Sequence, residues 1–170
     1  GVNGNYGFNE VFNLVGPLVP FPRIGVGYQV GARWAQCNLS GNTFGSSSRN
    51  QIFITTALCH RAFRNRGLQW GVAYDWLTDD YYVKSTLAQM RFEMSWLFRC
   101  NHEIGFWGAA GVKNDSFVNT QNNTAPTTAN VRPMDQYNFF YRYTSCHGSQ
   151  ARFWGGLTGG FRGSSFGIVG

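Results

Sequence analysis

The chain has 170 residues, of which 17% are aromatic and only 13% are charged, with 22 glycines and a formal net charge of +6. This composition excludes a disordered chain, because disordered chains are poor in aromatic residues and rich in charge. It also excludes a bundle of membrane-spanning helices, because each would need about 20 apolar residues, and uncharged apolar runs such as Phe106–Val112 are much shorter.

Residues 1–22 come before the first Lys or Arg, and we expect them to form an N-terminal periplasmic segment. We assign residues 23–170 to one β-domain, in agreement with the length of the chain. The cations are spread from Arg23 to Arg162. Nucleic-acid-binding proteins usually concentrate such residues in a patch, so no nucleic-acid partner is expected.

Alternation with a period of two residues predicts strands along the rest of the chain. In residues 24–39, large apolar side chains such as Trp34 occupy the even positions, and small or polar ones such as Gln29 occupy the odd positions. Several of these segments are longer than an ordinary strand of about 5–6 residues. The predicted strands are residues 24–39, 50–63, 68–79, 86–99, 103–113, 136–144 and 151–161, with another beginning at 164–170.

The large side chains of these strands are expected to face lipid. If they filled a soluble core, the outer surface would be mostly Gly, Ala, Gln and Ser, with too few charges for a surface in water. Apolar-out, polar-in alternation is the pattern of transmembrane β-barrels. The predicted lipid-facing aromatic residues are Tyr28, Trp34, Trp70, Tyr74, Trp76, Phe92, Trp96 and Phe106.

The connections between the predicted strands alternate in length. Residues 40–49, 80–85 and 114–135 form the long ones, and residues 64–67, 100–102 and 145–150 form the others, which are mostly shorter. Outer-membrane barrels have long external loops and short periplasmic turns. The alternation therefore predicts an up-and-down meander whose N-terminal segment lies on the periplasmic side.

The opposite positions of the strands are expected to form a polar network in the lumen. Hairpin geometry places Asp75 near Gln89 and Arg91, and the geometry around Cys100–Asn101 places Arg99 opposite Glu103. The network either lines a selective pore or forms a salt-bridged plug, because side chains just fill a barrel of about eight strands. Its predicted members are Arg33, Asp75, Gln89, Arg91, Glu93, Arg99 and Glu103.

Three Cys–His combinations fall near the short turns: Cys59-His60, Cys100-x-His102 and Cys146-His147. Thiolate and imidazole groups are the usual zinc ligands. The alternatives are a disulfide between Cys100 and Cys146, which an oxidising periplasm would favour, or unpaired thiols. We retain the disulfide as a candidate and predict no metal site.

Catalysis by a serine nucleophile would require a base within hydrogen-bond reach. Ser95 is predicted to point inward, with His60 and His102 near the rim on its side, but the sequence contains no G-x-S-x-G turn. Residues 155–160 are rich in glycine but lack the lysine of a phosphate-binding loop. We therefore expect neither enzymatic activity nor a cofactor.

The segments GLQWGVAYDWLTDDYYV and LAQMRFEMSWLFRCNHEIGFWGAAG resemble uncharacterised outer-membrane β-barrel-like proteins of planctomycete bacteria. The resemblance extends over most of residues 20–170 and is most specific at Tyr74–Trp76 and at the turn around Cys100. Because these relatives carry only a domain-of-unknown-function label, the resemblance implies a fold and a compartment but no activity. Asn101 stands where such relatives are expected to have a second cysteine, which argues against a shared metal site.

Together these patterns predict an all-β, antiparallel up-and-down barrel of the transmembrane type, with about eight strands in this sequence. Residues 164–170 either close the barrel or lead into further strands, because bacterial single-chain barrels usually have an even number. We expect a structural or passive-pore protein of the bacterial outer membrane, with lipid as its partner. The alternative is a soluble or secreted β-barrel or β-sandwich that binds a ligand such as a glycan through its aromatic residues.

Overall fold

The computed structural model describes residues 6–18, 25–38, 48–62, 67–81, 84–98, 101–119, 127–145, 147–159 and 167–169. Their strands are β1 (Tyr6–Pro17), β2 (Val26–Asn38), β3 (Ser48–His60), β4 (Gly67–Asp80), β5 (Lys84–Phe98), β6 (His102–Lys113), β7 (Asp115–Asn119), β8 (Thr127–Val131), β9 (Gln136–Thr144), β10 (Gln150–Thr158) and β11 (Gly167–Val169). None of the described residues belongs to a helix that could cross a membrane.

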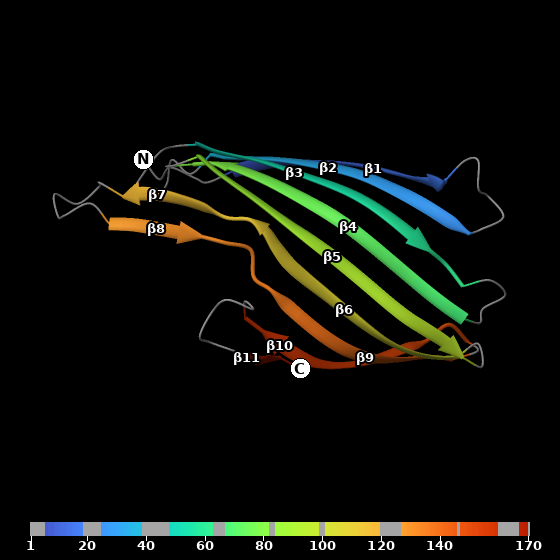
Figure 1. Ribbon diagram of the computed structural model, residues 1–170. Coiled ribbons are helices and arrows are strands. Elements are labelled where there is room, and N and C mark those ends of the chain that lie inside the picture. Colours follow the sequence, from blue (N-terminus) through green and yellow to red (C-terminus); the bar gives the residue numbers. More distant parts are fainter. Residues whose placement is uncertain are drawn as a thin grey trace.

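Nine of these strands form one antiparallel meander in the order β1-β2-β3-β4-β5-β6-β9-β10-β11. The strands run obliquely side by side, from β1 at the top of Figure 1 to β9, β10 and β11 at the bottom. The remaining two, β7 and β8, pair with each other in a hairpin that extends beyond the end of the sheet (Figure 1). The predicted all-β, antiparallel, up-and-down topology is therefore confirmed.

The predicted closure into a barrel is wrong for the described residues, because no pairing joins β1 to β11. The three residues of β11 pair only with Gly156–Thr158 of β10. In addition, β1 and β11 run in the same direction, because the antiparallel meander takes an even number of steps between them. A direct pairing of these two strands would be parallel, whereas every other pairing in the sheet is antiparallel.

The predicted domain boundary at residues 22 and 23 is also wrong, because Tyr6–Pro17 form the first strand of the sheet. Strand β1 pairs with β2 along its whole length, from Tyr6 opposite Asn38 to Pro17 opposite Gly27. The alternation of apolar and polar residues in β1 is irregular, because charged Glu10 lies among the large apolar positions and Val11 among the polar ones. For this reason the period-two pattern did not reveal the strand.

The alternation of long and short connections holds only in part. The pairing of β4 with β5 continues to Asp80 opposite Lys84, so residues 81–83 alone connect them, and not a long loop over 80–85. The connection over 114–135 is long, as expected, but it contains the β7–β8 hairpin. The hairpin was not predicted because its strands are short and polar.

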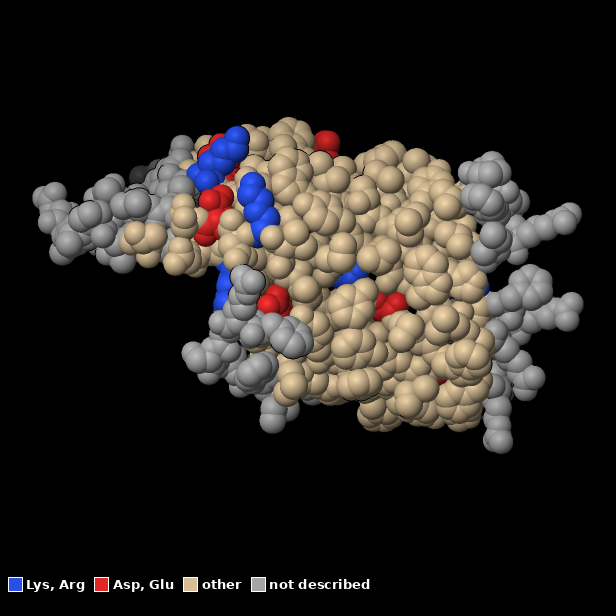
Figure 2. Space-filling model, viewed as in Figure 1, with Lys and Arg blue, Asp and Glu red and all other residues tan. Residues whose placement is uncertain are grey.

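The two faces of the sheet have opposite chemistry. Asp75 and Glu103 lie on one face, here called the polar face, and are only 2% and 5% exposed. The other face, here called the aromatic face, exposes Trp96 at 55% and Phe139 at 69%. The view in Figure 2 shows uncharged residues over most of the molecule, with charged residues gathered at the end that carries β7 and β8 and a few partly covered in the middle.

The polar face is concave. Arg152 of β10 lies 3.6 Å from Glu93 of β5, although β6 and β9 separate the two strands. Neighbouring strands are about 4.8 Å apart, so on a flat sheet these two backbones would be roughly 14 Å from each other. The curvature of the sheet brings their side chains together.

The strands are also staggered along the sheet. One continuous row of paired residues crosses it at Pro17, Gly27, Cys59, Gly71, Glu93, Trp107, Asn138 and Gly156. All the other residues of β1 lie on one side of this row, whereas most of β10 lies on the other. A regular shift of this kind is the shear that accompanies strand tilt in barrel-like sheets.

Gly156 is required where β10 approaches β9. A Cβ atom there would clash with the carbonyl oxygen of Tyr137 and would lie 2.7 Å from Cα of Asn138, both of them backbone atoms. Gly156→Ala is therefore expected to lower the free energy of unfolding by about 1–3 kcal/mol, measured by chemical denaturation. Gly71→Ala is the matched control, because its Cβ would make only ordinary contacts, at 3.7 and 3.8 Å. Equal effects of the two variants would contradict this close approach.

Asp115 ties the β7–β8 hairpin to the sheet. Its carboxylate accepts hydrogen bonds from the backbone N–H of Thr86 at 2.7 Å and of Ser116 at 2.9 Å. These two bonds, first that of Thr86, hold the pKa of Asp115 below its usual value. Because the pKa of Asp115 is lowered in the folded protein, the ionised carboxylate stabilises the fold at pH values above the ordinary aspartate pKa. This stabilisation is lost as the pH falls through the lowered pKa.

The amide proton resonance of Thr86 is therefore expected to titrate with a midpoint below the usual aspartate pKa, measured by NMR. In Asp115→Asn this titration should disappear, while the amide resonance of Gly111, whose N–H donates to Asp135 at 2.7 Å, should be unchanged by the substitution. A Thr86 resonance that does not follow pH in the unmodified protein would contradict the tether.

Candidate functional site

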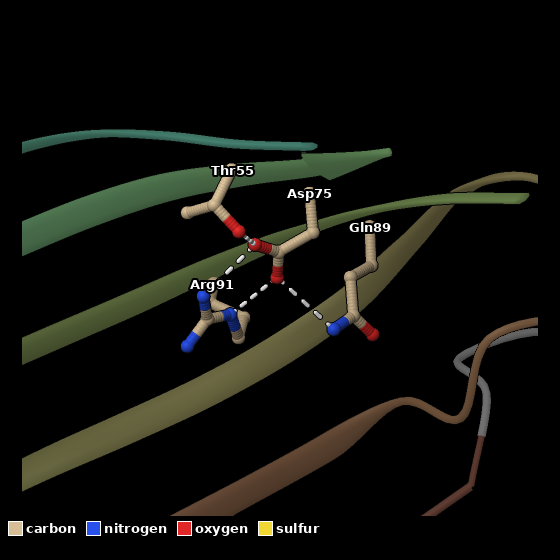
Figure 3. Close-up of polar contacts among 4 residues, drawn as sticks. All are labelled: Thr55, Asp75, Gln89 and Arg91. Atoms are coloured by element: carbon tan, nitrogen blue, oxygen red, sulfur yellow. Dashed lines mark hydrogen bonds and ion pairs between the residues drawn. The ribbon is translucent and has the colours of Figure 1, made fainter. Parts of the chain in front are cut away.

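Side chains from three consecutive strands converge on the carboxylate of Asp75 in β4 (Figure 3). Arg91 of β5 donates from Nε to one oxygen and from Nη2 to the other, the latter at 2.8 Å. The hydroxyl of Thr55 in β3 donates at 2.7 Å, and Nε2 of Gln89 in β5 donates at 3.2 Å. A buried carboxylate is tolerated here because a fork of two charged N–H groups and two neutral donors satisfies it.

The prediction that Asp75, Gln89 and Arg91 come together is confirmed. The register supports it, because Thr55, Asp75 and Gln89 stand directly opposite one another in adjacent strands. Thr55 was missed as a member of this group. Its position on the polar side of the predicted strand was the only signal for it, and it was too weak to distinguish Thr55 from its neighbours.

A second charged group lies on the same face toward the ends of β9 and β10. Arg142 of β9 is 3.2 Å from Glu103 of β6 and 3.7 Å from Glu93 of β5. Arg152 of β10 is 3.6 Å from the other oxygen of Glu93. We call these four residues the arginine-pair cluster. Glu93 and Glu103 were predicted, whereas Arg142 and Arg152 were not, although Arg142 lies on the polar side of its predicted strand.

The predicted pairing of Arg99 with Glu103 is wrong. Glu103 stands opposite Leu97 in the register of β5 and β6, and its ion-pair partner is Arg142. Phe98 stands opposite His102, so residues 99–101 connect the two strands, one residue earlier than the predicted connection 100–102. This displacement moves the register, so that Leu97 and not Arg99 stands opposite Glu103. Arg99 itself lies outside the described residues.

The other charged residues of the polar face for which the structure shows partners are bound locally, outside these two groups. Arg33 of β2 donates from Nε to Oδ1 of Asn9 in β1 at 2.8 Å, away from both groups above. Arg49 of β3 is bound by both oxygens of Asp79 in β4, near the end that carries the hairpin. The predicted network is thus several separate groups and not one continuous network.

A hollow of about 340 Å³ opens on the polar face beside the arginine-pair cluster. Its polar lining includes Glu93, Glu103, Arg142, Ser95 and Gln69. Smaller hollows of about 180 and 220 Å³ lie next to Asp75 and next to Arg91. The polar face therefore has room for small solutes close to its charges.

All eight predicted aromatic residues fall on the aromatic face, opposite Asp75 in the alternation of their strands. Trp34, Tyr74, Trp76 and Trp96 are exposed, and Tyr28, Trp70, Phe92 and Phe106 are partly covered. Partial cover comes from neighbouring rings: Phe106 lies 5.6 Å from Phe92 and 4.9 Å from Phe139, between ring centroids. The face is a continuous aromatic surface; its contact with lipid stays a prediction.

The serine–histidine arrangement is not formed. Ser95 lies on the polar face, whereas His102 is on the aromatic face, with Nδ1 2.6 Å from the hydroxyl of Tyr141. His60 stacks on Trp70 at 6.1 Å between ring centroids.

Cys100 and Cys146, the candidate disulfide, lie outside the described residues. Cys37 and Cys59 are free thiols. Over the described ranges, no three His, Cys, Asp or Glu residues gather as metal ligands would.

The Asp75–Arg91 pair is asymmetric, because Asp75 is buried and the Arg91 side chain is about half exposed. Arg91→Gln leaves a buried carboxylate without its charged partner and is expected to cost about 2–3 kcal/mol of unfolding free energy. The double variant Asp75→Asn with Arg91→Gln should cost less than Arg91→Gln alone, in denaturant titrations. Arg49→Gln is the control at a more open pair and should cost about 1 kcal/mol or less. Additive losses in the double variant would contradict the coupling.

Comparison with known proteins gives a family and nothing finer. The model of the family of unknown function (DUF6666) matches residues 1–170, which is the whole chain. No curated protein matches the chain. No solved structure matches it either. The planctomycete origin and the membrane setting expected from the resemblance are not part of this match and stay predictions. The chain, with its sheet of one polar and one aromatic face, belongs to the family of unknown function DUF6666.

Proposed function

We propose that this chain forms the wall of a β-barrel embedded in the outer membrane of a bacterium, with a structural or passive-pore role and no chemistry of its own. One observation carries the proposal: charged side chains gather on the concave face, where Asp75 and Glu103 are buried, while large apolar side chains are exposed on the convex one. This arrangement is the inverse of a water-soluble protein.

The aromatic face would be costly in water. Beside Trp96 and Phe139, it exposes Met94 at 54% and Ile104 at 56%. These four residues are neighbours across β5, β6 and β9, so they form one patch. Large contiguous apolar patches are rare on soluble monomers and mark surfaces that another apolar medium or partner covers. Lipid tails would provide that medium over the whole face at once.

Strand length and the position of the charges agree with a bilayer. A tilted membrane-spanning strand needs about 9–11 residues; β2 to β6 have 12 to 15, and β9 and β10 have 9. The charged residues on the aromatic face of these strands, Asp80, Lys84 and Lys113, lie where the strands meet the hairpin end. In a bilayer these positions would reach the headgroups.

In this setting the polar face lines the lumen. Its carboxylates Asp75, Asp79, Glu93 and Glu103 are each paired with an arginine, which lowers the cost of enclosing them and agrees with either a narrow pore or a plug. Backbone groups at an open sheet edge would be unsatisfied in lipid, so in the membrane β1 requires pairing with a further strand. The sheet of this chain therefore supplies a segment of the barrel wall.

A soluble or secreted glycan-binding protein is the second candidate, because exposed rings can stack on sugars. The surroundings of the rings argue against it. Trp96, for example, stands between Leu68 and Ile104 in the register, neither of which can bond a sugar hydroxyl. The continuous apolar surface favours lipid over a glycan.

Tryptophan fluorescence with brominated lipid tests the proposal. Variants that keep only Trp96, on the aromatic face, or only Trp107, on the polar face, are reconstituted in vesicles with bromine on the acyl chains. Bromine should quench the emission of Trp96 strongly and that of Trp107 weakly.

Weak quenching of both tryptophans would refute the membrane wall. If the Trp96 emission then changed on addition of oligosaccharides, the glycan-binding function would replace it. Circular dichroism of each variant in the same vesicles checks that the strands are retained.

A further inference from the structure

Two like charges stand directly opposite each other in the polar face. Arg142 of β9 and Arg152 of β10 are register partners. Directly opposed like charges destabilise a strand pair unless something compensates for them. The pairing of β9 with β10 does not by itself account for two arginines at these positions.

The ring of Phe140 lies beneath both guanidinium groups. They lie 5.4 and 4.0 Å from the ring centroid of buried Phe140. The ring fits there because Gly105 stands opposite it: a Cβ at Gly105 would lie 2.6 Å from the ring. Contact with the face of an aromatic ring stabilises cations and fixes where they sit.

The carboxylates that neutralise the two arginines hold them unequally. Glu103 is buried and lies 3.2 Å from Arg142. Glu93 lies 3.6 Å from Arg152 and 3.7 Å from Arg142, longer than the 2.7–2.9 Å typical of charge-assisted hydrogen bonds. The side chain of Glu93 is also 42% exposed. Glu93 is thus a loose counter-ion shared between two guanidinium groups.

The space for a ligand lies beside this carboxylate. The hollow of about 340 Å³ is lined by Arg142, Glu93, Ser95 and Gln69. Ser95 is only 4% exposed. A volume of this size falls in the range of small-molecule sites. The hollow therefore offers both a charged end and neutral hydrogen-bonding groups.

We propose that Arg142 and Arg152 bind the anionic group of a small solute, a carboxylate or a phosphate, in the place now taken by the Glu93 carboxylate. Two adjacent guanidinium groups present N–H donors in the geometry that such anions accept. Glu103 remains paired with Arg142 and keeps that side chain oriented. This inference rests on the proposed function in assigning the site to a lumen, where it names the class of solute.

Binding of inorganic phosphate and of citrate to the purified chain in detergent, at low salt, tests the proposal by isothermal titration calorimetry. Glu93→Gln removes the competing carboxylate and is expected to tighten binding about tenfold. Arg152→Gln removes a charged donor and is expected to weaken it about tenfold or more. Arg152→Lys, which keeps the charge but loses the fork, should recover part of that loss.

Arg49→Gln is the matched control, because it removes an arginine of the same face outside the cluster, and it should leave binding unchanged. Thermal unfolding of every variant shows whether it is folded. Unchanged binding in a folded Arg152→Gln, or weaker binding in a folded Glu93→Gln, would overturn the site and leave a purely structural ion cluster. If neither citrate nor phosphate binds to the unmodified chain, the proposal is equally overturned.

The two proposals fail separately. A chain whose Trp96 is quenched by brominated lipid but which binds no anion keeps its membrane wall and loses this site. A chain that binds phosphate without quenching keeps the arginine site and loses its place in the membrane.

Discussion

Neutralisation of charge on a concave surface is the constraint on which the rest of this structure depends. Curvature gathers the polar side chains of many strands into a small space and buries the carboxylates of Asp75 and Glu103. Each buried charge must therefore find a partner within the protein, since an unpaired buried charge would cost several kcal/mol. Asp75 meets this demand by accepting four hydrogen bonds, and Glu103 does so by its ion pair with Arg142.

The curvature that gathers the charges also spreads the aromatic face. Side chains on a convex surface diverge, so even rings in contact, such as those of Phe106 and Phe139, leave much of their area open. No second layer of the described residues covers this face. In this sheet the apolar side chains point outward and the polar side chains point inward, the reverse of a water-soluble protein. An apolar medium would therefore suit the outer face.

The arginine-pair cluster shows how the same arrangement can carry a specific site. Phe140 and Gly105 occupy opposite positions, so a large ring fits where a neighbouring strand has no side chain. That ring holds two guanidinium groups, and the loosely placed Glu93 completes their charge balance. Structural neutralisation and an exchangeable anion position are thus compatible in one cluster.

Local sequence patterns were sufficient for most of the strands and for contacts across one hairpin. Residues 68–79 and 86–99 alternate cleanly, and one short turn fixes their register, so Asp75, Gln89 and Arg91 could be brought together before the structure was known. The same reasoning failed for Glu103, because the turn at 99–101 lies one residue earlier than the predicted connection 100–102 and so moves the register of β5 and β6. It failed also for β1, where Glu10 and Val11 interrupt the alternation.

By itself, the sequence determined that the chain is an antiparallel meander with a polar side and an aromatic side, because a period of two residues is a local property of each strand. Only the tertiary structure decided which charges of distant strands meet, such as Glu93 of β5 and Arg152 of β10, and that the described sheet stays open. Those outcomes depend on curvature and on register shifts that accumulate across many strands. The residue pattern within one strand specifies neither the curvature of the sheet nor the accumulated register shift.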